Sequence, residues 1–133
     1  MTGKAKLVTG KVLKTTRKLY DVAVEGRIIQ CVVRGKLSTE DSEYSTVRTG
    51  DNVRVSLASE REGIIQEILP RRSRLSRLIE SRAYKEQIVA ANIDQILIIM
   101  STRSPEFKSG LLDRYLIIAQ RNHIHAIICI NKI

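Results

Sequence analysis

Hydrophobic and polar positions alternate in short runs through the first half of the chain. Such alternation is typical of strands that turn one face toward a core. Glu25-Gly26 predicts a tight turn between the second and third runs, and Glu62-Gly63 predicts a turn into the fifth. The pattern therefore predicts five strands, over residues 7–13, 19–24, 27–33, 52–57 and 64–69.

The third and fourth predicted strands are separated by residues 34–50, a polar segment without periodicity that we interpret as a long loop. Five short strands with this loop placement are typical of a five-stranded Greek-key barrel, the OB-fold. Such barrels bind nucleic acid across a strand face and its loops, although a small β-barrel without a ligand has the same pattern. Pro70 ends the last strand because it has no N–H for the ladder. We expect an OB-fold domain over residues 1–70 and a basic linker over residues 71–91.

The composition changes at Asn92, where the α/β pattern begins. Residues 95–100 are almost continuously aliphatic, as in a strand buried on both faces. An amphipathic helix is predicted over residues 110–122 and a second buried strand over residues 126–130. Two such strands joined by a helix pair in parallel as a βαβ unit. Because two strands cannot cover their own sheet, we interpret residues 92–133 as the start of a larger α/β domain.

The net charge of +9 is concentrated in one short stretch. Residues 71–82 hold five arginines against a single glutamate. A polyanion, most simply RNA, would bind such a stretch through phosphate contacts and counterion release. A solvated charged face is the alternative interpretation.

Several classes of protein are disfavoured. No apolar run approaches the roughly 20 residues of a membrane span, and the N-terminus does not resemble a signal peptide, so we expect a cytoplasmic protein without a membrane partner. The two cysteines and two histidines lack metal-ligand spacing, so no metal site is expected in this chain. These four residues are Cys31, Cys129, His123 and His125.

The last predicted strand runs directly into Asn131 and Lys132. Ligands of open parallel sheets bind beyond the carboxyl ends of the strands. The dipeptide resembles the start of Asn-Lys-x-Asp, the guanine-specificity motif of GTPases, with Ile133 at the free position. The resemblance implies that Asn131 steadies the base and its loop and that the stem of Lys132 packs along the base. The aspartate that accepts the guanine N–H groups would be the next residue.

The order of motifs is informative. An ordinary GTPase has its phosphate-binding Gly-x-x-x-x-Gly-Lys-Ser/Thr loop before its guanine motif. Gly3-Lys4, Gly10-Lys11 and Gly35-Lys36 all lack the glycine five positions upstream that this loop requires. A guanine motif reached before any phosphate loop implies a circularly permuted P-loop GTPase domain.

Taken together, the segments of the chain resemble those of one family, the bacterial small-ribosomal-subunit-biogenesis GTPases (ribosome small-subunit-dependent GTPase A). One departure is Arg48-Thr49, where a more apolar residue is usual. The segments that carry the resemblance are residues 31–37 (CVVRGKL), 50–53 (GDNV), 68–71 (ILPR), 75–77 (LSR), 91–95 (ANIDQ), 112–116 (LDRYL) and 131–132 (NK).

The resemblance implies a GTP phosphohydrolase that binds the small ribosomal subunit and its RNA through the barrel. It implies GTP hydrolysis stimulated by that subunit during late maturation, release afterwards, and a monomer when full length. GTP or GDP with magnesium and a structural zinc would be bound by the full-length protein. Because phosphoryl transfer depends on groups that residues 1–133 do not supply, we expect this chain alone not to hydrolyse GTP.

Two groups of basic residues are the candidate RNA contacts. Arg34 and Lys36 flank Gly35, which allows close backbone approach to phosphate. The second group follows the barrel and consists of Arg71, Arg72, Arg74 and Arg77. Arg77, together with Arg82, could instead pair with Glu80 and Glu86 or dock the two domains together.

Two other functions remain open. One is a stand-alone OB-fold RNA-binding protein without nucleotide chemistry, and the other is a protein-interaction module with a charged surface. The residue that follows Ile133 in the gene separates them from the GTPase hypothesis. Aspartate there favours the GTPase, whereas alanine or lysine nearly excludes it.

Overall fold

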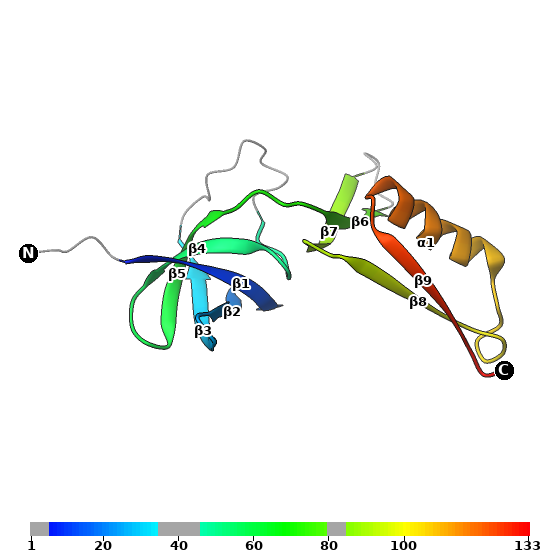
Figure 1. Cartoon of the computed structure of the whole chain (residues 1–133), viewed down its shortest axis with the longest axis horizontal. Helices are drawn as coiled ribbons and strands as arrows, with labels where there is room; N and C mark the ends of the chain where they lie inside the picture. The colour runs from blue at the N-terminus through cyan, green and yellow to red at the C-terminus, as the bar shows by residue number, and fades with distance from the viewer. Residues whose placement is uncertain (1–5, 35–45, 80–84) are drawn as a thin grey trace, which may run out of the picture. The chain divides into compact units, whose positions relative to one another are not determined.

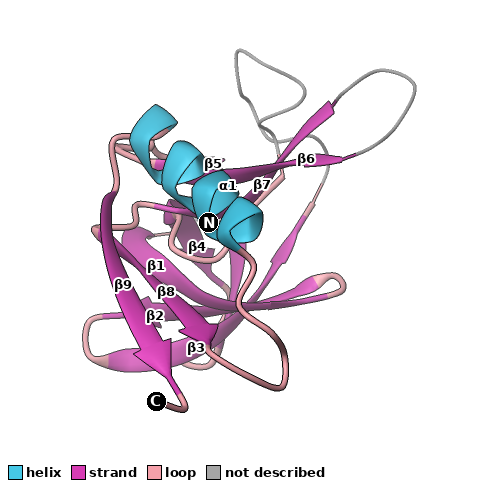
Figure 2. Cartoon of the chain, turned by 90° about the vertical axis from the view of Figure 1, so that its right-hand side faces the viewer, coloured by secondary structure: helices cyan, strands magenta, loops and turns pink. Residues whose placement is uncertain are grey.

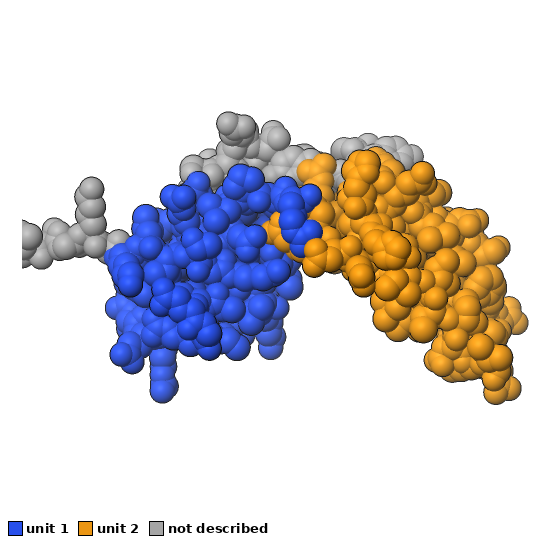
Figure 3. Space-filling model, viewed as in Figure 1, with its two compact units in different colours: residues 1–72 blue, residues 73–133 orange. Residues whose placement is uncertain are grey.

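The computed structural model describes residues 6–34, 46–79 and 85–133, and the chain divides into two compact units. The first unit is Met1–Arg72 and the second is Ser73–Ile133 (Figure 3). The change of unit thus falls two residues after the predicted end of the barrel at residue 70.

The described residues of the first unit form a closed β-barrel with strand order β1-β2-β3-β5-β4 (Figure 1). Pairing of β1 with β4 closes the barrel, and β3 and β5 are the parallel pair, whereas the other neighbours are antiparallel. This arrangement confirms the predicted five-stranded OB-type barrel. Its strands are β1 (Leu7–Thr16), β2 (Leu19–Val24), β3 (Arg27–Val33), β4 (Asn52–Leu57) and β5 (Glu62–Ile68).

The barrel core is aliphatic, with valine as its commonest residue. The inward positions of the strands recur at every second residue, as in β4, where Val53 and Val55 are fully buried. Branched side chains suit this pleated, closed interior. The buried core consists of Val8, Val12, Val22, Val24, Ile29, Cys31, Val47, Val53, Val55 and Ile65.

The turns differ from the prediction in two places. Strand β1 continues to Thr16, well past residue 13, because the hairpin to β2 needs only two residues and Arg17 adopts a positive φ of 50° there. Glu62-Gly63 is the start of β5 and not a turn. The reversal before β5 is instead closed by the N–H groups of Ala58 and Ser59, which donate to the carbonyl of Glu62. Glu25-Gly26 does form the predicted tight turn, with φ of 49° and 79°.

Gly63 is the second residue of β5, at a position where the neighbouring strands leave no room for a side chain. A Cβ added at this position would lie 2.5 Å from Val55 Cγ1 and 3.3 Å from Cys31 Sγ. The glycine that looked like a turn signal is therefore a site of close packing between strands.

The second unit begins with two strands in the segment that was expected to be a linker. Strand β6 (Arg74–Ile79) pairs antiparallel with β7 (Lys85–Ala91). The N–H of Asn92 donates to the carbonyl of Ser73 at 2.8 Å and closes the open end of this pair. Arginine and other polar residues interrupt the apolar pattern of this ribbon, which explains why the sequence pattern missed it, although Ser76, Ile88 and Ala91 are buried.

The α/β part follows as predicted. Strand β8 (Gln95–Ser101) pairs in parallel with β9 (His125–Asn131), and helix α1 (Ser109–Arg121) connects them and packs against both (Figure 2). The expected burial of the two strands was wrong for this structure: β8 is not buried on both faces, and Ile127, Ile128 and Ile130 of β9 are 40–45% exposed. Ile98 and Met100 are buried, but Leu97 and Ile99 are 57% and 61% exposed, because α1 covers one face and no described residue covers the other. Among the described residues, no helix combines the length and apolarity that crossing a membrane requires.

Candidate functional site

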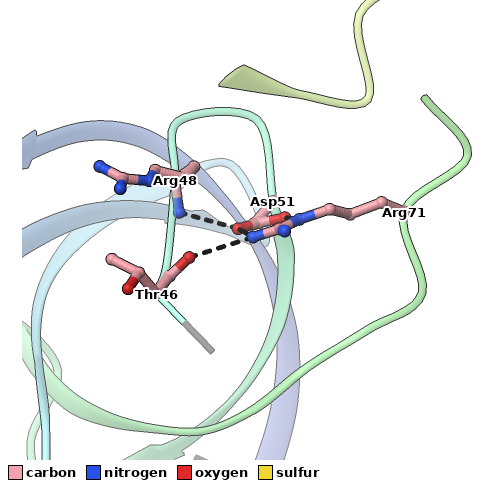
Figure 4. A network of polar contacts seen from close by, with 4 residues as sticks. All are labelled: Thr46, Arg48, Asp51 and Arg71. Carbon is pink, nitrogen blue, oxygen red and sulfur yellow. Dashed lines mark hydrogen bonds and ion pairs between the residues drawn. The ribbon is translucent and has the colours of Figure 1, made fainter. Parts of the chain in front are cut away.

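A buried carboxylate connects the start of β4 to the segment that follows β5. Asp51, directly before β4, is fully buried, and Arg71, after β5, has a side chain that is 11% exposed. The guanidinium of Arg71 donates through Nε to Oδ1 at 2.7 Å and through Nη2 to Oδ2 at 2.8 Å. Its Nη2 also donates to the carbonyl of Thr46 at 3.1 Å, and the backbone N–H of Arg48 donates to Asp51 Oδ2 at 2.8 Å (Figure 4).

This network gives Arg71 a structural role. Both oxygens of the carboxylate are satisfied by charge-assisted bonds, and the planar guanidinium uses its fork geometry to bind them. Arg71 was expected among the RNA contacts, and its binding to RNA stays a prediction. Its Nε and Nη2 are engaged inside the barrel unit, so the proposed RNA contacts below leave it out. The pairing had a sequence signal, since Asp51 and Arg71 both lie in segments that carry the family resemblance, but spacing did not reveal that they meet.

The other basic candidates lie in different environments. Arg34 is exposed at the end of β3, and Lys36 lies outside the described residues. Arg72 is exposed at the end of the first unit. In the second unit, Arg74 is half-buried at the start of β6, and Arg77 is exposed and donates through Nε to Gln87 Oε1 at 2.9 Å across the ribbon. Arg77 thus has an amide partner, whereas the pairings of Arg77 and Arg82 with Glu80 and Glu86 that the sequence suggested lie outside the described side chains.

Asn131 and Lys132 lie at the carboxyl end of the parallel sheet, as their position after the strand predicted. Asn131 is the last residue of β9 and pairs with Ser101 at the end of β8. Both Asn131 and Lys132 are exposed. The two strand ends and the loop that follows β8 therefore meet at the edge where open α/β sheets bind ligands.

The loop after β8 is hydrogen-bonded to this dipeptide. The N–H of Thr102 donates to the carbonyl of Asn131 at 3.1 Å, and the Thr102 hydroxyl donates to the carbonyl of Lys132. The Lys132 ammonium donates to the carbonyl of Ser104. Lys132 has a φ of 60°, a left-handed conformation that is uncommon for a residue with a side chain. Sequence reasoning identified Asn131 and Lys132 but missed Thr102 and Ser104, because no motif marks them.

The described residues do not fit a metal site. No three of their histidine, cysteine, aspartate and glutamate side chains gather in a way that could hold a metal ion. Cys31 is a buried free thiol and Cys129 is an exposed one.

Two family models match the chain in succession. The model of the RsgA N-terminal domain matches residues 9–65, which is the barrel, and the model of the RsgA GTPase matches residues 68–133, which includes the βαβ unit and Asn131-Lys132. The two models together cover nearly the whole chain. The chain belongs to the RsgA family.

Curated RsgA relatives align with almost all of the chain. Proteins named small ribosomal subunit biogenesis GTPase RsgA are 36% identical in Caldanaerobacter subterraneus and in Chlorobaculum parvum, over 95% of this chain in each case. The RsgA of Paraburkholderia phytofirmans is 39% identical over 94% of the chain. The chain spans only 38%, 43% and 37% of the length of these three relatives.

Solved structures agree with this assignment. YloQ, described as a circularly permuted GTPase, is 29% identical, with a TM-score of 0.64 over 94% of this chain and 40% of its own. YjeQ from Thermotoga maritima is 25% identical, with a TM-score of 0.68 over 96% of this chain and 42% of its own. The fold is therefore an OB-type barrel followed by the first βαβ unit of a circularly permuted RsgA GTPase domain.

Proposed function

We propose that residues 1–133 are the RNA-binding and guanine-recognising portion of a GTPase that acts in the maturation of the small ribosomal subunit. One observation carries the proposal. Asn131 and Lys132 lie at the carboxyl edge of a parallel sheet, in a chain whose two halves match the two RsgA models in order. The names of the relatives, which join a GTPase to small-subunit biogenesis, support the same assignment.

In this proposal the first unit binds RNA and the second unit recognises the guanine base. The barrel binds the RNA of the small subunit, with Arg34, Lys36 and Arg72 reaching phosphates. Arg74 and Arg77, on the β6–β7 ribbon, add positive charge that attracts the same RNA. In the second unit, Asn131 steadies the guanine base and the Lys132 stem packs along it. The charge of the arginine-rich stretch supports this division, since phosphate contacts dominate affinity for nucleic acid.

The finer parts of the proposal concern the whole protein. They are hydrolysis of GTP with magnesium stimulated by the small subunit, a structural zinc, a monomeric state and a cytoplasmic location. The described residues of this chain contain no cluster of side chains that could hold either metal. The aspartate that completes the guanine motif is expected to follow Ile133 in the gene, and sequencing across that position tests it.

RNA binding is tested with a variant that leaves the buried network intact. Arg72, Arg74 and Arg77 are changed together to alanine, and binding to small-subunit RNA is measured by filter binding over a salt series. If each arginine contacts one phosphate, the slope of log affinity against log salt falls by roughly two to three, and affinity falls most at low salt. Arg71 stays in place because its loss would disturb the barrel itself.

The matched control removes the same charge elsewhere. Arg103, Arg114 and Arg121 are exposed on the α/β part, and their triple alanine variant should keep most of the salt slope. Equal losses in both variants would mean that net charge alone attracts the RNA. An unchanged slope in the folded test variant would contradict the arginine assignment and favour a protein-interaction role for this surface.

A further inference from the structure

The loop between β8 and α1 is bound to the carboxyl end of β9 at three points. Two of them come from Thr102, whose N–H donates to the Asn131 carbonyl and whose hydroxyl donates to the Lys132 carbonyl. The third runs in the other direction, from the Lys132 ammonium to the Ser104 carbonyl. The dipeptide and the loop therefore hold each other in place.

These hydrogen bonds stabilise an unfavourable backbone conformation at Lys132. With a φ of 60°, Lys132 is in a region that costs about 1 kcal/mol or more for a residue with a side chain. Past the end of the ladder, the Lys132 carbonyl has no strand partner among the described residues, and the Thr102 hydroxyl supplies a donor to it. The hydroxyl thus favours the left-handed conformation over an extended continuation of β9.

We propose that Thr102 is a positioning residue for guanine recognition, and that its hydroxyl holds the backbone of Lys132 so that the Asn131 and Lys132 side chains can meet the base. The inference rests on the proposed guanine role of these two residues. Thr102 does not touch the base itself. It acts through the turn that carries the groups that do.

The test uses the 133-residue chain followed by one aspartate, the residue expected next in the gene, because that carboxylate discriminates guanine from adenine. The method is nuclear magnetic resonance. Thr102→Val keeps the branched shape and removes the hydroxyl, Thr102→Ser keeps the hydroxyl, and Arg103→Ala changes an exposed neighbour in the same loop. Two quantities are measured in each variant. The first is the intraresidue NOE between the amide proton and Hα of Lys132, which is strong only at positive φ. The second is the shift of the Asn131 and Lys132 amides on titration with GMP, with AMP as the control nucleotide.

In the wild-type chain and in Thr102→Ser we expect the strong NOE and a larger response to GMP than to AMP. In Thr102→Val the NOE should weaken and the dissociation constant for GMP should rise about fivefold, the loss of one ordinary hydrogen bond. Arg103→Ala should behave as the wild-type chain does.

Retention of both the NOE and the GMP affinity in Thr102→Val would overturn the inference. A weakened NOE with unchanged affinity would overturn it too, because the turn would then not matter for the base. If the wild-type chain itself does not distinguish GMP from AMP, the guanine role of this edge fails. Thr102 is then only a turn residue.

Discussion

At the scale of single residues, the buried Asp51–Arg71 pair joins the start of β4 to the segment that follows β5. The chain enters β4 at Asp51 and has left β5 before it reaches Arg71, and the two side chains join these points inside the protein. Removing one partner of a buried ion pair leaves the other charge without compensation, which costs far more than the pair contributes on its own. The same sequence also contains an exposed pair, Arg54–Glu67, with 3.7 Å between Arg54 Nε and Glu67 Oε2.

The two pairs make a matched comparison. Arg71→Ala should lower the free energy of unfolding of the barrel by about 3 kcal/mol, because the Asp51 carboxylate stays buried and loses its bidentate partner. Arg54→Ala should cost less than about 1 kcal/mol, since both side chains of that pair are about half exposed. Urea unfolding followed through the methyl signals of the barrel valines measures both. Similar costs for the two variants would refute the structural role assigned to Arg71.

Cys31 gives a prediction that depends on pH. Burial, and in smaller part the nearby Asp21 carboxylate, raises the pKa of the Cys31 thiol from 9.0 to about 11. Because the folded state holds the thiol neutral, the stability that this contributes is present below pH 9 and is lost as pH rises from 9 to 11. Thiol titration of the native chain at pH 8 should therefore label Cys129 quickly and Cys31 only on unfolding. Cys129→Ser should have no fast thiol, and rapid labelling of that variant would contradict the prediction.

At the scale of elements, the barrel depends on close approach between its strands as much as on apolar side chains. Gly63 in β5 lies against Val55 of β4, and Gly10 in β1 lies against Val22 and Val24 of β2 in the same way. Each glycine allows a neighbouring valine to fill the interior. A closed barrel this small has little room for a further methyl group.

Gly63→Ala should destabilise the barrel by about 1–3 kcal/mol, because the new Cβ would lie 2.5 Å from Val55 Cγ1 and 3.2 Å from the Ser56 carbonyl oxygen. Glu62→Ala, at the exposed preceding position of the same strand, is the control and should stay within about 0.5 kcal/mol. The urea assay described for Arg71 measures both. If Gly63→Ala is as stable as the control, β5 moves away from β4 more easily than the packing indicates.

At the scale of the whole molecule, the two units correspond to the two RsgA models. The N-terminal-domain model matches residues 9–65 in the first unit, and the GTPase model matches residues 68–133, which include the whole second unit. The barrel unit is closed, with a continuous core of its own. The second unit has one helix against a two-stranded parallel sheet, and several large apolar side chains of that sheet are exposed. Under the proposed function, this βαβ unit supplies one edge of a nucleotide site and not the groups that act on the phosphates.

The chain by itself should therefore show no measurable GTP turnover. Its sequence contains no Gly-x-x-x-x-Gly-Lys loop, and phosphoryl transfer depends on such a loop and on magnesium to stabilise the charge of the transition state. Release of inorganic phosphate from GTP, with and without small ribosomal subunits, is the measurement. Turnover that copurifies with residues 1–133 through several independent steps would show that the interpretation of motif order is wrong.

The sequence alone determined the local structure wherever a periodic pattern was unbroken. Alternation predicted the barrel strands, and the aliphatic runs on either side of the 3.6-residue pattern predicted β8, α1 and β9. It failed at the β6–β7 ribbon, where arginines and other polar residues interrupt the apolar positions and leave no clear period. It also misread Gly63, because a glycine that is needed for close packing looks the same in sequence as one that is needed for a turn.

The candidate site shows the same difference between what local sequence predicts and what the fold decides. The sequence placed Asn131 and Lys132 at the end of a parallel strand, because that position follows from chain order. Only the tertiary structure decided that Arg71 binds Asp51, 20 residues away, and that Thr102 contacts Lys132, 30 residues away. A charged or hydroxyl side chain looks equally able to bind a ligand or a neighbour until the fold brings its partner within hydrogen-bonding distance.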